Sequence, residues 1–343
     1  MNARHPRSDT ASAGLGANIV GAEVPHESAV LHVTGGAHYT DDLPEPRATL
    51  HLALGTSPVA HGRLRGVDLA AVRAAPGVVD VITAADIPGV NDVGPIQHDD
   101  PVFAVDYVQF VGQPVFAVAA TSVNAARRAA RLARYNIEPL PPILTIAEAM
   151  AAQSFVLPPV HVTRGNATAA LVRAPHRLQG TVECGGQDHF YLEGQIALAT
   201  PRERGGMHIH SSTQHPGEVQ HMVAHVLGLS AHDVVVECRR MGGGFGGKET
   251  QMSLFACAAA LVAQRTGRAA KLRLDRDDDM RSTGKRHAFS YQYDVGFDAA
   301  GHILGLDLTL ASRCGFSADL SGPVNDRAVF HVDNTYWLPD VAL

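Results

Sequence analysis

The stretch "RRMGGGFGGKET", residues 239–250, is the densest local pattern in the chain, and its interpretation decides the fold. Gly242, Gly244 and Gly247 satisfy G-x-G-x-x-G, the fingerprint of dinucleotide-binding folds. The stretch lies between a predicted strand and a predicted helix (249–266), which is the context that nucleotide-binding loops require. The glycines and the helix N-terminus would favour an anion at this position.

Two charged residues argue against a nucleotide. Lys248 completes all of the P-loop pattern G-x-x-x-x-G-K-[ST] except its last letter, where Glu249 stands. A carboxylate there would repel a polyphosphate, and neither residue suits a helix that packs closely against a dinucleotide-binding sheet. A strand ending at Asp275 would still supply the acidic residue of a dinucleotide site. A cradle for another anionic cofactor and a tight turn without ligand also stay open.

The composition is that of an ordinary globular protein. The 343 residues suffice for about two domains, with 45% hydrophobic and 18% charged residues. The net charge of −6 gives no support to nucleic-acid binding. The longest apolar stretch, residues 254–263, fits a buried helix better than a membrane span. We therefore expect neither nucleic acid nor membrane as a partner.

The N-terminus and the cysteines point to an intracellular protein. Residues 1–27 are polar and rich in small residues, without the apolar core of a signal peptide, and are predicted to form a flexible tail. The four cysteines are far apart and form no C-x-x-C pair, which argues against a cysteine metal site and favours reduced thiols. We expect a cytoplasmic location.

The chain divides at a Pro-rich segment that ends at residue 144. Residues 28–144 are predicted to form one α+β unit, and the apolar run 113–120 reads as a strand buried on both faces. Residues 145–343 form the second domain, which includes an alternating hairpin at 289–310. Ser122 is predicted to cap a helix that runs to residue 134.

Two polar residues elsewhere are candidates for ligand contact. Gln187 follows Gly185 and Gly186 and precedes a predicted aromatic-rich strand, so its amide could donate to a ligand oxygen. A surface glutamine is the alternative. Arg327 has apolar neighbours, and its guanidinium could hold a planar oxyanion by paired hydrogen bonds. A structural ion pair is the alternative.

Histidines cluster in the second domain. His221 and His225 are four residues apart on one predicted helix face, a spacing that can hold zinc. No H-E-x-x-H motif and no third ligand at a fitting distance accompany them, so solvated or capping histidines are the better interpretation. The same interpretation covers His208, His210 and His215.

Several motifs in order resemble one known family. They are "TGGAHYTDDLPEP", "GQPVFAVAA", "GQDHFYLEGQIALA", "SSTQHPGEVQ", "RMGGGFGGKE", "LDRDDDMRSTGKRH" and "DRAVFHVDNTY". They are similar to the molybdenum-cofactor subunits of xanthine dehydrogenases, in the wider molybdenum hydroxylase family that includes the aldehyde oxidases. The resemblance covers about residues 28–343. It implies an α+β chain with an α/β hammerhead domain (28–144) and a partial mixed α/β molybdopterin-binding domain (145–343).

The resemblance also implies roles for single residues. Gln187 would hydrogen-bond the oxo ligand of molybdenum, and Phe245 and Gly246 would lie against the metal and the pterin. Glu249 would contact the purine ring as a catalytic residue. Arg327 would hold a purine carbonyl oxygen and stabilise negative charge there. Because the chain carries both Glu249 and Arg327, the resemblance favours a purine over an aldehyde as substrate.

The implied activity is hydroxylation of hypoxanthine and xanthine toward urate with water-derived oxygen, in purine catabolism. The electrons would pass to a partner carrying 2Fe-2S clusters and FAD, in a hetero-oligomer. Because the family continues beyond the position matching Leu343, we expect this chain to be truncated and inactive alone. A non-catalytic remnant, half of a split subunit and an aldehyde oxidase-type hydroxylase stay open as alternatives. A nucleotide-binding enzyme has the least support.

Overall fold

The computed structural model describes residues 20–343. The chain divides into two units, Met1–His38 and Tyr39–Leu343, which are described separately. In the first unit, helix α1 (Ala29–Thr34) ends at Gly35, whose left-handed φ of 73° caps it. Most of the predicted flexible tail, residues 1–27, lies outside the described residues.

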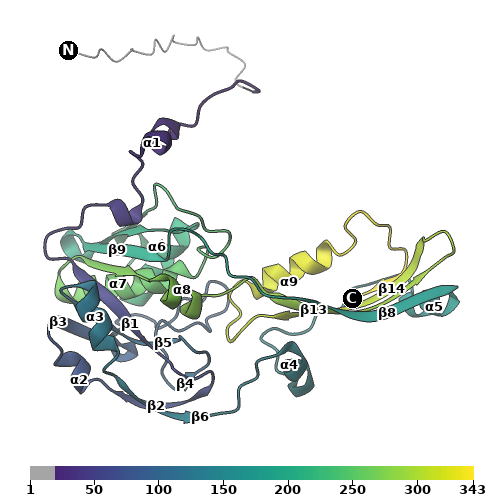
Figure 1. The fold of residues 1–343 in the computed structure, drawn as a ribbon, viewed down its shortest axis with the longest axis horizontal. Coiled ribbons are helices and arrows are strands. Elements are labelled where there is room, and N and C mark those ends of the chain that lie inside the picture. Colours follow the sequence, from purple (N-terminus) through teal and green to yellow (C-terminus); the bar gives the residue numbers. More distant parts are fainter. Residues whose placement is uncertain (1–19) are drawn as a thin grey trace. The chain divides into compact units, whose positions relative to one another are not determined.

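The second unit contains a seven-stranded mixed sheet (Figure 1). Its strands are, in spatial order, β11 (Val234–Glu237), β10 (Met207–Ser211), β9 (Ile196–Pro201), β12 (Ala270–Arg273), β1 (Leu50–Thr56), β5 (Pro114–Ala120) and β3 (Val78–Thr83). β1 pairs in parallel with β12, with Leu50 opposite Ala270. One sheet therefore joins strands from both sides of residue 144.

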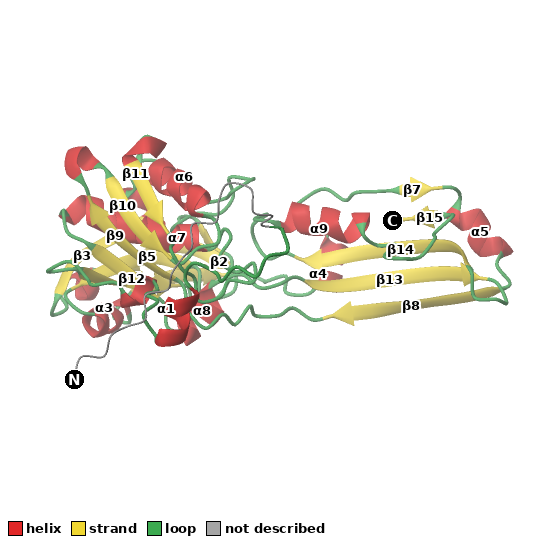
Figure 2. Cartoon of the chain, turned by 90° about the horizontal axis from the view of Figure 1, so that it is seen from above, coloured by secondary structure: helices red, strands yellow, loops and turns green. Residues whose placement is uncertain are grey.

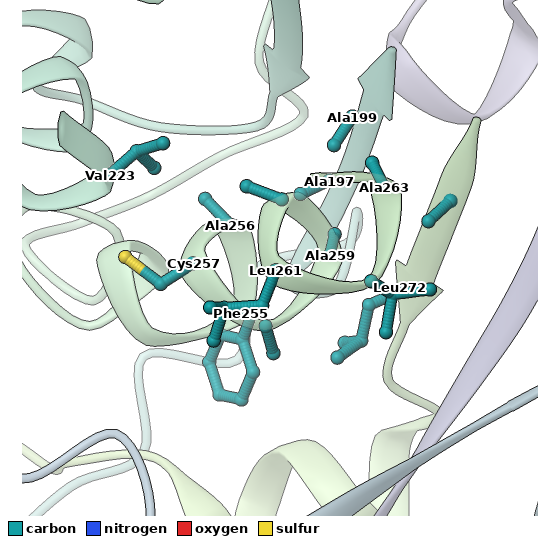
Figure 3. Packing of buried hydrophobic residues seen from close by; sticks show 14 of the residues in the cluster. Ala197, Ala199, Val223, Phe255, Ala256, Cys257, Ala259, Leu261, Ala263 and Leu272 are labelled. Atoms are coloured by element: carbon teal, nitrogen blue, oxygen red, sulfur yellow. The ribbon is translucent and has the colours of Figure 1, made fainter. Parts of the chain in front are cut away.

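Helix α7 (Met252–Thr266) is the centre of the main hydrophobic core (Figure 3). It packs against β9 and against helix α6 (Pro216–Leu227). Every residue from Met252 to Ala263 except the partly buried Leu254 is buried, which explains why this segment is apolar on almost all sides. The expected buried helix is thus confirmed. None of the helices among the described residues is both long and apolar enough to cross a membrane.

Strand β5 separates the main core from a second one. All of its residues are buried, as expected for a strand covered on both faces. The second core includes a three-stranded sheet of β4 (Tyr107–Val108), β2 (Gly62–Asp68) and β6 (Arg134–Pro139). Helix α2 (Ala70–Arg73) packs against β3 of the seven-stranded sheet, and helix α3 (Val123–Ala130) packs against β1 and β5.

The helix predicted up to residue 134 is shorter than expected. Ser122 does cap α3, because its Oγ accepts a hydrogen bond from the Ala125 amide. The helix ends at Ala130, since Arg134 already begins β6 and pairs with Asp68 of β2. Pairing within the three-stranded sheet therefore overrides the helical pattern of the sequence.

A separate five-stranded sheet contains the predicted hairpin (Figure 2). Its strands are β7 (Thr163–Arg164), β15 (Val341–Ala342), β14 (Ile303–Arg313), β13 (Ala288–Phe297) and β8 (His176–Cys184). Helices α4 (Ile146–Ala152), α5 (Ala167–Arg173) and α9 (Ser321–Phe330) all contact β14. Helix α8 (Arg276–Ser282) lies between β12 and β13 in the sequence.

Candidate functional site

Neighbouring protein atoms leave no room for a side chain at the three glycines of the G-x-G-x-x-G pattern. A Cβ on Gly242 would lie 2.6 Å from the Cβ of Glu193, and one on Gly244 would lie 2.5 Å from the Oε1 of Gln214. A Cβ on Gly247 would lie 2.7 Å from a histidine ring in the facing loop. No side chain fits at these distances, so close packing of the protein on itself accounts for the G-x-G-x-x-G pattern.

Several backbone amides of the loop already have protein acceptors. The Gly242 amide donates to the Oε2 of Glu193 at 2.8 Å. The Oε1 of Gln214 accepts from the amides of Gly246, at 2.8 Å, and Lys248, at 3.3 Å. These amides are therefore not available to cradle a phosphate as a nucleotide-binding loop requires.

The Lys248 side chain is fully buried and turned into the protein. Its Nζ donates to the backbone oxygen of Glu193 at 2.6 Å and to the Oγ of Ser212 at 2.7 Å. It also lies 3.5 Å from the Glu193 carboxylate and 4.6 Å from the Tyr191 ring centroid. Burial lowers the pKa of Lys248, and the Glu193 carboxylate partly offsets this effect. A P-loop lysine must reach a phosphate, which this one cannot do.

The acidic residue that a dinucleotide site would need is used elsewhere. Asp275 caps α8, where its Oδ1 accepts from the Asp278 amide at 2.9 Å. Its other oxygen lies 2.9 Å from Arg127. Both nucleotide interpretations of the loop thus lose the groups on which they depend.

We call Gly242, Gly244, Gly247 and Lys248 the loop base, and Phe245 with Gly246 the loop tip. Unlike the base, the tip is exposed. The Phe245 side chain is 75% exposed, on a backbone with a left-handed φ of 54°. Gly246 has a φ of 92°, and a Cβ there would have only the His189 ring within 4 Å. The base therefore holds rigidly a tip that is open for a ligand to approach.

The aromatic stretch after Gln187 is a loop, and the predicted strand at this place was wrong. Asp188 accepts a hydrogen bond from the Phe190 amide at 2.7 Å, and Phe190 has a left-handed φ of 48°. This turn interrupts the extended backbone that strand pairing needs. The strand begins only at Ile196. As a result Phe190 and Leu192 are exposed on the loop that faces the Gly-rich loop.

Backbone hydrogen bonds hold Gln187 in place, whereas its side chain makes no hydrogen bond among the described residues. It forms an isolated antiparallel bridge with Arg286, with N–O distances of 3.3 and 3.0 Å. A Cβ on Gly186 would lie 3.2 Å from the Arg286 oxygen, so a glycine suits this close approach. The Gln187 side chain is exposed, and its amide has no hydrogen-bond partner within residues 20–343.

Glu249 lies in a turn rather than in the helix predicted from residue 249. Helix α7 begins only at Met252. The side chains around Glu249 explain the delay, because Lys248 is held in the loop base and the Thr250 hydroxyl donates to Asp319 at 2.7 Å. The Glu249 carboxylate is exposed and forms no ion pair in the described part of the chain.

Hydrogen bonds link the Glu249 segment to the start of α9. The Gln251 side chain donates to Asp319 at 3.2 Å and accepts from the Gly284 amide at 3.0 Å. His287 lies 2.8 Å from the Oγ of Ser321, the first residue of α9. The structure thus joins the segments carrying Glu249 and the beginning of α9.

Arg327 lies further along α9. It is six residues after the start of the helix, which corresponds to about 9 Å along the axis. Its side chain is exposed, and its guanidinium has no hydrogen bond or ion pair with any residue that the structure describes. The structural ion pair considered for this arginine is therefore not formed within residues 20–343.

Sequence reasoning missed the residues that support the loops. The Tyr191 hydroxyl donates to the buried Asp279 carboxylate at 2.6 Å. Gln195 donates to both the Tyr191 hydroxyl and the Gly247 oxygen, at 2.8 and 2.9 Å. Burial and the Asp279 carboxylate raise the pKa of Tyr191. Their only sequence signal is polar residues beside apolar runs, which surface positions share.

One cavity lies away from these residues. It has a volume of about 580 Å³ and is lined by α4 and by strands β8, β13 and β14. None of the five expected site residues lines it. His221 and His225, the pair whose spacing could hold zinc, are both exposed. This agrees with their interpretation as solvated histidines.

Two domain families match this chain. The molybdopterin cofactor-binding domain matches residues 149–343, and the a/b hammerhead domain of aldehyde oxidase and xanthine dehydrogenase matches residues 34–141. The first match alone covers more than half of the chain. The chain belongs to the molybdenum hydroxylase family, with a hammerhead domain followed by a molybdopterin-binding domain. The fold class and cofactor expected from the resemblance are confirmed.

The similar proteins are much longer than this chain. It is 44% identical to the xanthine dehydrogenase of Oryza sativa subsp. japonica over 94% of its own length. It is 41% identical to the xanthine dehydrogenase/oxidase of Gallus gallus over 95%. In both cases the chain spans 24% of the length of the relative.

Solved structures share the fold. The aldehyde oxidoreductase from Desulfovibrio gigas matches with a TM-score of 0.85 at 25% identity, over 93% of this chain and 37% of that one. The CO dehydrogenase from Oligotropha carboxidovorans matches with a TM-score of 0.74 at 22% identity, over 84% of this chain and 39% of that one. The second likeness concerns the fold alone.

The site residues fit a molybdenum–pterin group. Gly246 lacks a side chain at an open position, so a bulky cofactor can approach the backbone. Phe245 offers an exposed flat ring on a supported loop. The free side-chain amide of Gln187 can donate to an anionic oxygen. Gln187, Phe245 and Gly246 are thus chemically compatible with such a group.

Proposed function

We propose that this chain forms part of the active site of a xanthine dehydrogenase that hydroxylates hypoxanthine and xanthine toward urate. The observation that carries the proposal is the unpaired state of Glu249 and Arg327. Both are charged and exposed, and neither has an ion-pair partner within the described residues. Charged groups without internal partners suit recognition of a polar ring better than that of an aldehyde.

When bound, the molybdenum–pterin group would supply oxygen insertion from water and take up two electrons. The chain's own residues would do the rest. The Arg327 guanidinium would stabilise negative charge that develops on the purine oxygen. The Glu249 carboxylate would accept or shuttle a proton at a ring nitrogen. Gln187 would orient the group through its amide, and Phe245 would exclude water beside it.

The proposal includes partners. Electrons would leave through a partner or further domain carrying 2Fe-2S clusters and FAD, in a hetero-oligomer. The similar xanthine dehydrogenases are about four times as long as the part that this chain matches, which is consistent with further domains in those proteins. A cytoplasmic location belongs to the same proposal, supported by the spacing of the cysteines, which are all free in the described structure.

The test is Arg327→Ala in the complete subunit, with its cofactors loaded. We expect kcat/KM for xanthine to fall by roughly 100-fold or more, because a charge-stabilising group is lost from the transition state. Turnover of a small aldehyde should fall far less, since it lacks the purine oxygen. Asp326→Asn, the neighbouring exposed residue on the same helix, is the matched control and should leave both rates unchanged.

Two results would contradict the proposal. Equal losses for xanthine and aldehyde would remove the assigned role of Arg327 and favour an aldehyde oxidase-type hydroxylase. A complete subunit that contains neither molybdenum nor pterin by elemental and cofactor analysis would indicate a non-catalytic remnant.

A further inference from the structure

Two histidines and a glutamate gather on neighbouring strands, and none of them belongs to the proposed molybdenum site. His208 and His210 alternate on β10 with the buried residues Met207 and Ile209, so they share the other face of the sheet. Glu237 lies on β11 directly opposite His210 in the parallel register. One ligand atom from each side chain lies within 4.8 Å of the others.

The distances suit a small tetrahedral metal ion. The His208 Nε2 lies 3.4 Å from the Oε2 of Glu237, and the His210 Nδ1 lies 3.9 Å from the same oxygen. The ligand atoms of a tetrahedral zinc ion are about 3.3–3.4 Å apart, because its bonds are about 2.0–2.1 Å long. Of the two histidine–glutamate pairs, one already matches this spacing and the other must close by about half an ångström. The two histidines lie within 4.8 Å of each other, and rotation of their side chains can bring them closer.

The donor set and its surroundings also suit zinc. Two imidazoles and one carboxylate form a ligand set used by zinc sites that keep a fourth position open. The histidine side chains are 14% and 24% exposed, whereas that of Glu237 is 54% exposed. The ring nitrogens are therefore partly shielded, and water can still reach the fourth position. Strand backbones on both sides of the site hold the ligands in register.

The guanidinium of Arg202 lies beside His208 and disfavours a metal cation there. The Nη2 of Arg202 lies 2.7 Å from the His208 Nδ1 and donates to it, which leaves the proton of this ring on Nε2. Zinc binding at Nε2 would need the other tautomer and would bring a second positive charge close to the guanidinium. Arg202 is exposed, so its side chain can move into solvent when the metal binds. It should weaken binding without preventing it.

We propose that His208, His210 and Glu237 form a zinc site that links the edge strand β11 to β10. The fourth ligand is water. Because β11 is a four-residue strand at the end of the sheet, a metal bridge to its inner neighbour stabilises the fold locally. The site is independent of the proposed xanthine dehydrogenase activity.

The experiment titrates the metal-free full chain with ZnCl₂ and, in parallel, with CoCl₂, whose visible spectrum reports tetrahedral nitrogen and oxygen ligands. We expect one tight equivalent and a rise in the thermal unfolding midpoint. His210→Ala should weaken binding by roughly 100-fold and Glu237→Gln by at least about tenfold. Arg202→Ala should tighten binding, because it removes the competing donor and the positive charge.

A double variant controls for the other histidines. His221→Ala with His225→Ala removes the exposed pair on α6 and should leave the tight equivalent unchanged. Glu237→Gln keeps the shape of an exposed side chain, so it is a binding test even if a histidine variant unfolds. Wild-type affinity in Glu237→Gln and His210→Ala, or loss of the tight equivalent in the control, would overturn the site. Weaker binding in Arg202→Ala would do the same.

Discussion

The loop base and the exposed site residues differ in how their charges are satisfied. Lys248 is fully buried, with its Nζ held by Glu193 and Ser212. Glu249, the next residue, is exposed and has no ion pair within the described residues. Arg327 on α9 shows the same free state as Glu249.

This difference separates two kinds of importance. Residues of the loop base position the backbone, so changes there should cost stability first. Glu249 and Arg327 contribute little to the fold, so changes there should affect ligands only. Substitutions in the two groups test this division, and the largest expected effect on the free energy of unfolding comes from the loop base.

Lys248→Ala should be the most damaging change. It would leave the Glu193 carboxylate partly buried without its cation, and removing one partner of a buried pair costs about 3–5 kcal/mol. Chemical denaturation monitored by circular dichroism measures the loss. Glu249→Ala is the matched control and should change stability by less than about 0.5 kcal/mol. Similar losses in the two variants would contradict the comparison.

Gly247→Ala should be the next largest. The added Cβ would lie 2.7 Å from the His189 ring and 2.8 Å from the Tyr191 ring. Forcing these rings aside should cost about 1–3 kcal/mol. Gly185→Ala is the control, because a Cβ there meets nothing within 4 Å. The same denaturation experiment compares them, and an equal effect at both positions would show that the loop base is not tightly packed.

Asp100, unlike Lys248, is a buried ionisable group whose neighbours carry charge of the same sign. Burial, together with the carboxylates of Asp319, Asp92 and Asp99, raises the pKa of Asp100 to about 7. A raised pKa in the folded state means that the fold holds a proton which the unfolded chain releases, so this group makes stability fall as pH rises from about 4 to 7.

Asp100→Asn should therefore stabilise the protein at about pH 8, by roughly 1–2 kcal/mol, and have little effect near pH 4. Thermal or chemical unfolding of both proteins across this range measures the difference. A gain in stability that does not depend on pH would show that the carboxyl group is not the cause.

The smallest expected effect is that of Arg327→Ala on stability. Its exposed side chain has no partner among the described residues, so the free energy of unfolding should change by less than about 0.5 kcal/mol. Denaturation of the 343-residue chain measures this. A large loss would mean that Arg327 supports the fold, and its effect on xanthine turnover could then not be assigned to the substrate.

Local patterns in the sequence predicted much of the fold. The strand buried on both faces, the buried apolar helix and the 289–310 hairpin all follow from the spacing of apolar residues, and the structure confirms them. The capped helix after Ser122 was confirmed at its start, but its end was wrong. Start signals are local, whereas the end depended on pairing with a distant strand.

The candidate site was only partly predictable. Glu249 was recognised as the residue that spoils a P-loop, and the resemblance of the motifs supplied the cofactor. The supporting contacts of Glu193 and Gln214 could not be foreseen, because they join segments 32 or more residues apart. The meeting of His208 and His210 with Glu237 was missed for the same reason, since it depends on the register of β10 and β11.

The sequence by itself determined the class of domain, the local elements and the residue types available for a cofactor, because these depend on composition, spacing and short motifs. Only the tertiary structure decided which charges are buried and which are free. Lys248 and Glu249 are adjacent letters in the sequence, yet the fold places one inside and leaves the other outside. The reason is that burial depends on contacts with distant segments, which local sequence does not encode.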